Sequence, residues 1–160
     1  GQFDEVVLKT MPDPMRARRS IWLPFILSTL KADAQTIIVG HSSGAVAAMR
    51  LLEDQQLHGA VLVAACHTDL GEESEAQAGY YPPSGGDWQW ERIKANAGGN
   101  ILLLHSDNDP FIPLVEAQHV AEQLGAPCQL RVEPSRSHFF QPCEAIVTAV
   151  MDVAQRLDAT

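Results

Sequence analysis

The chain has 160 residues, of which 46% are hydrophobic and 19% charged, a composition typical of one globular domain and not of a disordered chain. Its formal net charge of −9 argues against nucleic acid or an anionic membrane surface as a partner. No apolar run reaches the roughly 18 residues that a membrane-spanning helix needs, and no signal peptide is visible.

The cysteines and histidines argue against a disulfide-stabilised protein and against a metal site. Cys66, Cys128 and Cys143 are scattered and odd in number, which favours free thiols in a reducing compartment over a disulfide framework. We therefore expect a cytoplasmic protein, with the nucleus as an additional location. The six histidines show no metal-ligand spacing, and neither G-x-G-x-x-G nor G-K-[ST] occurs, so no metal, cofactor or nucleotide is expected.

The first part of the chain is predicted to alternate short strands with helices. Residues 3–10 have the apolar centre of a strand, which the two prolines of residues 11–14 end. Residues 16–30 have helical spacing, with Pro24 indicating a break or the first turn of a second helix. Next come a predicted strand at 36–40, a helix at 43–55 and a strand at 59–65.

The rest of the chain repeats this alternation after an irregular stretch at residues 66–87. Because that stretch follows the end of a strand, where active sites gather, we expect a lid-like insertion at about residues 66–90. The later predicted elements are a short helix at 88–95, strands at 100–105 and 129–132, a helix at 115–124 and an amphipathic helix at 144–157 with Ile146, Val147, Val150, Val153 and Leu157 inward. Apolar strands alternating with helices indicate an α/β fold, a mostly parallel sheet with helices on both faces, in a single domain.

The segment Gly40-His41-Ser42-Ser43-Gly44 lies between a predicted strand and a predicted helix. A strand, G-x-S-x-G and a helix together predict a nucleophile elbow, a turn that holds its serine strained and exposed above the sheet. Small neighbours are needed there, and the Ser43 N–H is placed to donate to an oxyanion. The alternative is a turn that binds nothing, or one that binds phosphate at a helix N-terminus.

A serine hydroxyl needs a general base, and the base needs an orienting acid; after an elbow of this kind the acid precedes the histidine in the chain. His138 follows the last predicted strand and is the predicted base. Asp107 and Asp109 both follow the strand at 100–105, and spacing alone does not separate them. His41 is interpreted as a packing or supporting group, whereas His67 lies near a strand end and stays a candidate for the pocket.

Longer runs of the sequence carry a resemblance to a known family. They are residues 11–14 (MPDP), 20–25 (SIWLPF), 36–45 (TIIVGHSSGA), 88–96 (WQWERIKAN), 107–111 (DNDPF) and 137–139 (SHF). Over essentially its whole length the chain resembles the retinoblastoma-binding protein 9 family, small single-domain serine hydrolases of the α/β-hydrolase superfamily. The resemblance implies that Ser42 is the nucleophile, Asp109 the acid and His138 the base.

Two features depart from the family pattern. The family begins with a strand and a glycine-rich loop, carrying the second oxyanion donor, before the region that matches residues 3–10. The resemblance therefore implies a fragment or truncated isoform, incomplete at its N-terminus, that retains only the Ser43 N–H. Because loss of one such donor typically costs about a hundred- to a thousandfold in rate, we expect impaired folding and low activity.

The second departure concerns a partner. The family motif L-x-C-x-E, which binds retinoblastoma protein, corresponds here to Leu30-Lys31-Ala32-Asp33-Ala34, without the cysteine or the glutamate. Binding of retinoblastoma protein through this motif is therefore not expected.

The predicted function is hydrolysis of a small ester or amide through an acyl-enzyme on Ser42. A non-catalytic protein-interaction module on a hydrolase scaffold is the alternative. The candidates for an apolar substrate pocket, with core and lid packing as their alternative role, are Trp88, Trp90, Phe111, Tyr80 and Tyr81.

Overall fold

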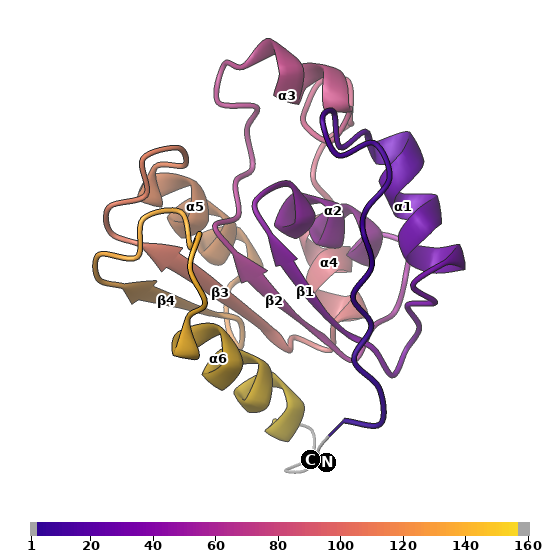
Figure 1. Ribbon diagram of the computed structural model, residues 1–160, viewed down its shortest axis with the longest axis vertical. Coiled ribbons are helices and arrows are strands. Elements are labelled where there is room, and N and C mark those ends of the chain that lie inside the picture. Colours follow the sequence, from indigo (N-terminus) through magenta and orange to yellow (C-terminus); the bar gives the residue numbers. More distant parts are fainter. Residues whose placement is uncertain (1–2, 157–160) are drawn as a thin grey trace.

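A parallel sheet of four strands forms the centre of the molecule (Figure 1). The computed structural model describes residues 3–156. The strands are β1 (Ile37–His41), β2 (Gly59–Val63), β3 (Ile101–Ser106) and β4 (Gln129–Glu133), and they lie in this order across the sheet. Every neighbouring pair is parallel, which confirms the predicted α/β class and places all four carboxyl ends at one edge.

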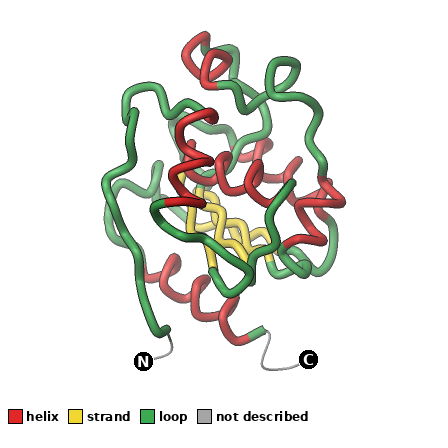
Figure 2. Tube along the Cα trace, turned by 90° about the vertical axis from the view of Figure 1, so that its right-hand side faces the viewer, coloured by secondary structure: helices red, strands yellow, loops and turns green. Residues whose placement is uncertain are grey.

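Helices cover both faces of this sheet (Figure 2). One face is covered by α6 (Glu144–Gln155), which contacts β1, β2 and β3. The other face carries α2 (Ser43–Leu52), α4 (Trp90–Asn96) and α5 (Leu114–Leu124), with α1 (Arg19–Ser28) packed on α2. The short helix α3 (Glu73–Ala78) lies beyond the carboxyl ends of the strands (Figure 1). Within residues 3–156, no helix is both long enough and apolar enough to cross a bilayer.

Alternate residues of the central strands pack into two separate cores. In β2, Ala60 and Leu62 pack on the side of α2, whereas Val61 and Val63 pack with Ala149 and Val153 of α6. All residues of β2 and β3 are buried, so these strands have apolar side chains on both faces. This double burial explains why they appear in the sequence as continuous apolar runs.

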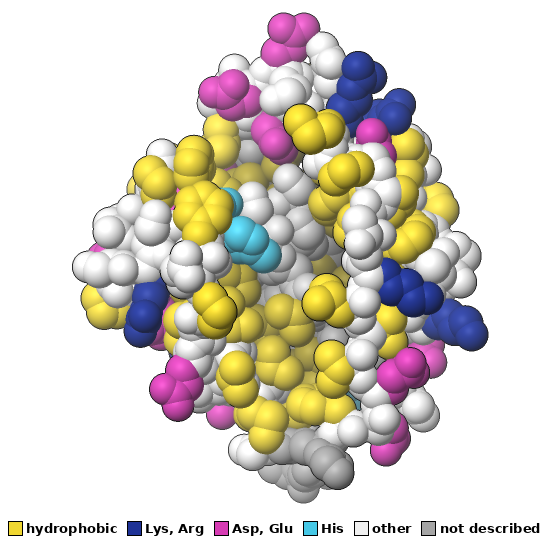
Figure 3. Space-filling model, in the orientation of Figure 1, with side chains coloured by type: hydrophobic (Ala, Val, Ile, Leu, Met, Phe, Trp, Pro, Cys, Tyr) yellow, Lys and Arg dark blue, Asp and Glu magenta, His cyan; other side chains and the backbone are white. Residues whose placement is uncertain are grey.

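The predicted strand at residues 3–10 is wrong. The segment runs as an extended loop that pairs with no strand, and its Val6 and Leu8 are 82% and 93% exposed. A strand needs a hydrogen-bonded neighbour, and the described part of the sheet ends at β1, where Val39 is 47% exposed. Hydrophobic side chains accordingly gather in a hollow on the face that α6 covers only in part (Figure 3).

Three smaller expectations also need correction. Pro24 neither breaks α1 nor starts a second helix, because Pro24 and Ser20 are both exposed and the Ser20 carbonyl that loses its partner can face water. Val147 does not face inward on α6 but is 62% exposed. The irregular stretch contains α3, and Leu157, predicted to face inward, lies outside the described residues.

The turn between β1 and α2 requires glycine at position 40 but not at position 44. A Cβ on Gly40 would lie 2.3 Å from the Gly44 carbonyl oxygen and 2.7 Å from the Ala45 nitrogen, and backbone atoms cannot move aside as a side chain can. A Cβ on Gly44 would meet nothing within 4 Å. Of the two motif glycines, only Gly40 therefore permits the close approach of strand and helix.

We expect Gly40→Ala and Gly44→Ala to change stability in opposite directions. Gly40→Ala forces the two backbones apart and should lower the free energy of unfolding by about 1–3 kcal/mol or more. Gly44→Ala adds a helix-forming residue inside α2 and should raise it by about 0.5–1 kcal/mol. Urea unfolding followed by circular dichroism measures both, and an unchanged midpoint for Gly40→Ala would contradict this account of the turn.

Candidate active site

Ser42 occupies the strained turn between β1 and α2. Its backbone angles are φ 56° and ψ −122°, a conformation that costs a non-glycine residue about 1–3 kcal/mol. The Ser42 N–H donates to the Val63 carbonyl of β2 at 2.9 Å, which ties the turn to the neighbouring strand. Because α2 begins at Ser43, the N–H of Ser43 has no acceptor within the helix and is free to bind an anion. The turn thus has the geometry expected of a nucleophile elbow.

His138 and Asp109 form a short, buried hydrogen bond. Nδ1 of His138 donates to Oδ2 of Asp109 at 2.7 Å, and the two side chains are only 9% and 1% exposed. The other carboxylate oxygen, Oδ1, accepts the backbone N–H groups of Phe111 at 2.9 Å and Ile112 at 3.0 Å. Burial alone would raise the pKa of Asp109, but the Ile112 N–H, the His138 ring and the Phe111 N–H together hold it below its usual value. The carboxylate therefore stays ionised and fixes the proton of His138 on Nδ1, which leaves Nε2 free to accept one.

The structure separates the two aspartates that spacing left equivalent. Asp107 is directed at the backbone instead of the histidine, since its Oδ1 accepts the Ser135 N–H at 2.8 Å. Two neighbouring side chains also accept backbone N–H groups of the loop that carries His138 (residues 134–140, the histidine loop). Ser106 Oγ accepts the Arg136 N–H at 2.9 Å, and Asn108 Oδ1 accepts the Ser137 N–H at 2.9 Å. Of the two candidates, only Asp109 contacts the His138 ring.

The contacts to Ser135 and Ser137 brace backbone that would otherwise be unfavourable. Ser135, Ser137 and Phe139 have φ of 54°, 52° and 53°, and none of them is glycine. The brace formed by Ser106 and Asn108 was missed from the sequence, although both lie within three residues of the predicted acid, Asp109. Their short polar side chains in a loop are typical turn formers, and nothing local shows that their acceptors serve a loop far away in the chain.

Ser42 and His138 line one cavity of about 570 Å³ at the carboxyl ends of the strands. Its apolar lining includes Phe111, and the rings of Phe111 and Phe140 lie 5.2 Å and 5.4 Å from the His138 ring. Of the predicted pocket residues, Phe111 and Tyr81 line this cavity, whereas Trp88, Trp90 and Tyr80 are not among its lining residues. The full lining is Ser42, Ser43, Cys66, Leu70, Glu72, Ser74, Glu75, Tyr81, Phe111, Ile112, Pro113, His138 and Phe140.

Trp88 and Trp90 instead pack beside α2, around a buried arginine. The Arg50 guanidinium stacks 3.7 Å from the centre of the Trp88 ring, and Trp90 stacks on Trp88 with ring centres 5.4 Å apart. Arg50 also donates to the carbonyls of Tyr80 at 2.8 Å and Gly86 at 2.7 Å. These aromatic side chains therefore hold the 80–88 stretch against the helix that starts at Ser43.

The remaining nucleophilic and basic groups near the cavity have other roles. Burial raises the pKa of the Cys66 thiol to about 12, so this cysteine stays a neutral thiol in the cavity that Ser42 also lines. His67 does not line the cavity; its Nδ1 lies 2.8 Å from Glu116 Oε2, and its ring stacks on His119. His105 is fully buried and its Nε2 donates to the Ile112 carbonyl at 2.9 Å.

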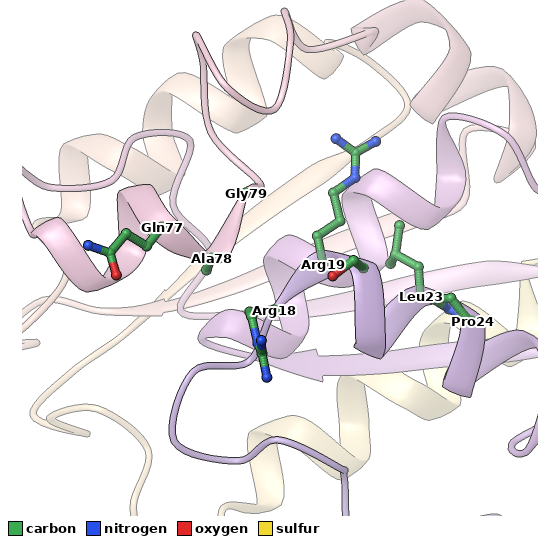
Figure 4. A pocket seen from close by; sticks show the side chains of 8 residues that line it. Arg18, Arg19, Leu23, Pro24, Gln77, Ala78 and Gly79 are labelled. Atoms are coloured by element: carbon green, nitrogen blue, oxygen red, sulfur yellow. The ribbon is translucent and has the colours of Figure 1, made fainter.

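A second cavity of about 480 Å³ lies between α1 and α3. Figure 4 shows the guanidinium groups of its Arg18 and Arg19 pointing apart. Arg18 pairs with Asp13 at 2.7 Å and Arg19 donates to the Gly85 carbonyl at 2.9 Å, so the two cations do not converge on a shared anion. Its lining offers neither a nucleophile with a base nor a convergent set of donors.

Comparisons with solved structures confirm an α/β-hydrolase-type fold. The ydeN gene product of B. subtilis superposes with a TM-score of 0.77 at 21% identity, covering 92% of this chain and 81% of that one. The meta-cleavage product hydrolase CumD of Pseudomonas fluorescens gives a TM-score of 0.60 at 17% identity, covering 94% and 76%. At this level of identity the likeness concerns the fold alone.

Sequence comparisons are more specific. Serine hydrolase RBBP9 of Rattus norvegicus is 47% identical over 135 residues, which cover 84% of this chain and 69% of the rat protein. The model of the serine hydrolase family matches residues 4–140. This favours an enzyme over a non-catalytic interaction module and confirms the predicted resemblance. The chain belongs to the serine hydrolase family, within the α/β-hydrolase superfamily.

Proposed function

We propose that this protein hydrolyses a small ester or amide with Ser42 as nucleophile, His138 as general base and Asp109 as orienting acid. The observation that carries the proposal is the buried 2.7 Å hydrogen bond from His138 to Asp109. His138 lines the same cavity as Ser42. A histidine held in this way presents a basic Nε2, and a serine hydroxyl is a weak nucleophile without such a base.

The residues divide the reaction between them. Nε2 of His138 takes the Ser42 proton as the hydroxyl attacks the substrate carbonyl, and the ionised Asp109 stabilises the imidazolium that results. The Ser43 N–H donates to the oxyanion of the tetrahedral intermediate. His138 then gives its proton to the leaving group, and water attacks the acyl-enzyme by the reverse sequence of proton transfers.

The walls of the cavity favour an apolar group on the substrate. Phe111 and Phe140 are 60% and 65% exposed at the mouth, beside His138, which leaves their faces free for an incoming acyl or leaving group. The opposite wall is Leu70, Glu72, Ser74, Glu75 and Tyr81, all from the stretch predicted as an insertion. Their position over the carboxyl ends of the strands supports a lid-like role for residues 66–90 in a single domain.

Ser42 is expected to carry all covalent labelling by a fluorophosphonate probe. Ser42→Ala removes the attacking oxygen and should abolish labelling, whereas Ser43→Ala keeps the backbone N–H and should still label. Labelling is read by fluorescence on a denaturing gel, with circular dichroism on each variant. Undiminished labelling of a folded Ser42→Ala protein would refute the proposal that Ser42 is the nucleophile.

The two aspartates are expected to differ sharply when each is changed to asparagine. In Asp109→Asn, the Phe111 and Ile112 N–H groups will hold the oxygen of the new amide, so its NH₂ faces His138 Nδ1 and drives the ring proton onto Nε2. This variant should therefore slow ester hydrolysis by about a thousand- to ten-thousandfold. Asp107→Asn keeps an oxygen for the Ser135 N–H and should lose less than about tenfold.

Initial rates with p-nitrophenyl acetate measure both aspartate variants, and urea unfolding checks that each is folded. Equal losses of hydrolysis rate in the two variants would mean that Asp109 does not orient the base, His138.

A further inference from the structure

We infer that His41 is a positioning residue that sets the distance between the nucleophile turn and the general base; the inference rests on the proposed function of Ser42 and His138. Nε2 of His41 lies 2.8 Å from the backbone carbonyl oxygen of His138. A carbonyl can only accept, so His41 carries its proton on Nε2 and donates it. The two rings also touch, with centres 4.7 Å apart.

The hydrogen bond from His41 to His138 joins the turn that carries the nucleophile to the loop that carries the base. His41 is the last residue of β1, and the next residue is Ser42, whose own N–H is fixed to β2. His138 lies in the loop after β4, at the opposite end of the strand order. Within residues 3–156, the bond from His41 is the one hydrogen bond that joins residues 37–44 to residues 134–140.

The other side-chain contacts that hold the histidine loop come from the end of β3 and not from β1. Ser106, Asp107, Asn108 and Asp109 all belong to the end of β3 and the loop that follows it. They fix His138 relative to its acid but do not relate it to Ser42. Within residues 3–156, the contact with His41 is the one hydrogen bond that does so directly. A displacement of reacting groups by about 1 Å can cost about a hundredfold in rate.

His41 acts through His138 and not through the substrate. It is absent from the lining of the cavity that holds Ser42 and His138. His41 is exposed as a residue, but the protein around its ring displaces water, and this and the neighbouring His138 lower the pKa of His41, so the neutral form with its Nε2 proton prevails near neutral pH. Its loss should therefore lower the rate of the chemical step and leave the affinity for substrate unchanged.

Four variants separate this role from simple packing. His41→Phe keeps the ring and removes the donor, whereas His41→Gln can place an amide N–H where Nε2 lies. His41→Asn has the same amide on a shorter side chain that cannot reach, and it replaces His41→Phe if that variant does not fold. His58→Phe makes the matched change before β2, at the other end of the sheet.

Two readouts apply to each variant: the kinetics of fluorophosphonate inactivation, divided into the maximal rate and the half-saturating probe concentration, and the Nδ1 proton resonance of His138 in ¹⁵N-labelled protein. We expect His41→Phe to reduce the maximal rate about ten- to a hundredfold at an unchanged half-saturating concentration. The His138 resonance should shift or broaden. His41→Gln should recover the rate to within about threefold, and His58→Phe should match the wild type.

The inference is overturned if His41→Phe matches the wild type in both readouts, or if His41→Gln is as slow as His41→Phe. A wild-type chain whose labelling does not depend on Ser42 would refute the proposed function instead. In that case the His138 resonance still decides whether His41 positions the loop, because it does not require catalysis.

Discussion

The buried hydrogen bond between His138 and Asp109 depends on a loop that could not hold its shape alone. Ser135, Ser137 and Phe139 surround the histidine with positive φ angles, each costing about 1–3 kcal/mol. The end of β3 and the loop that follows it offset part of that cost, because their side chains accept the N–H groups of Ser135, Arg136 and Ser137. The restricted backbone angles and these hydrogen bonds together hold the His138 imidazole in one orientation before a substrate binds.

The parallel sheet explains why these loops meet at all. Because β1 to β4 run in the same direction, the turn with Ser42, the loop with Asp109 and the loop with His138 all leave the sheet at one edge. The two cores, one against α2 and one against α6, bury the strands on both faces and fix the spacing between these loops. A site at this edge is therefore a property of the sheet, and the side chains on its loops decide the chemistry.

The sequence was informative wherever the signal was local. The apolar runs of β2 and β3, the G-x-S-x-G turn and a histidine after the last strand each depend on neighbouring residues, and these elements could be located with small errors at their ends. Where the deciding partner is distant, prediction failed. Residues 3–10 have the composition of a strand, but no strand among residues 3–156 pairs with them. Trp88 and Trp90 look like pocket residues, yet Trp88 stacks on Arg50 of α2 and Trp90 stacks on Trp88. The choice between Asp107 and Asp109 likewise depends on contacts with the loop after β4.

Arg50 shows how the cavity wall is coupled to the nucleophile. A buried guanidinium, 1% exposed here, is costly unless its donors are satisfied, and burial lowers the pKa of Arg50 despite the nearby Glu53. Arg50 meets that need with the carbonyls of Tyr80 and Gly86, the Glu53 carboxylate and the face of Trp88. Removing the 80–88 stretch from α2 would leave this buried charge with the Glu53 carboxylate but without the carbonyls of Tyr80 and Gly86 and the face of Trp88. The part of the wall that includes Tyr81 is therefore fixed to the helix that begins beside Ser42.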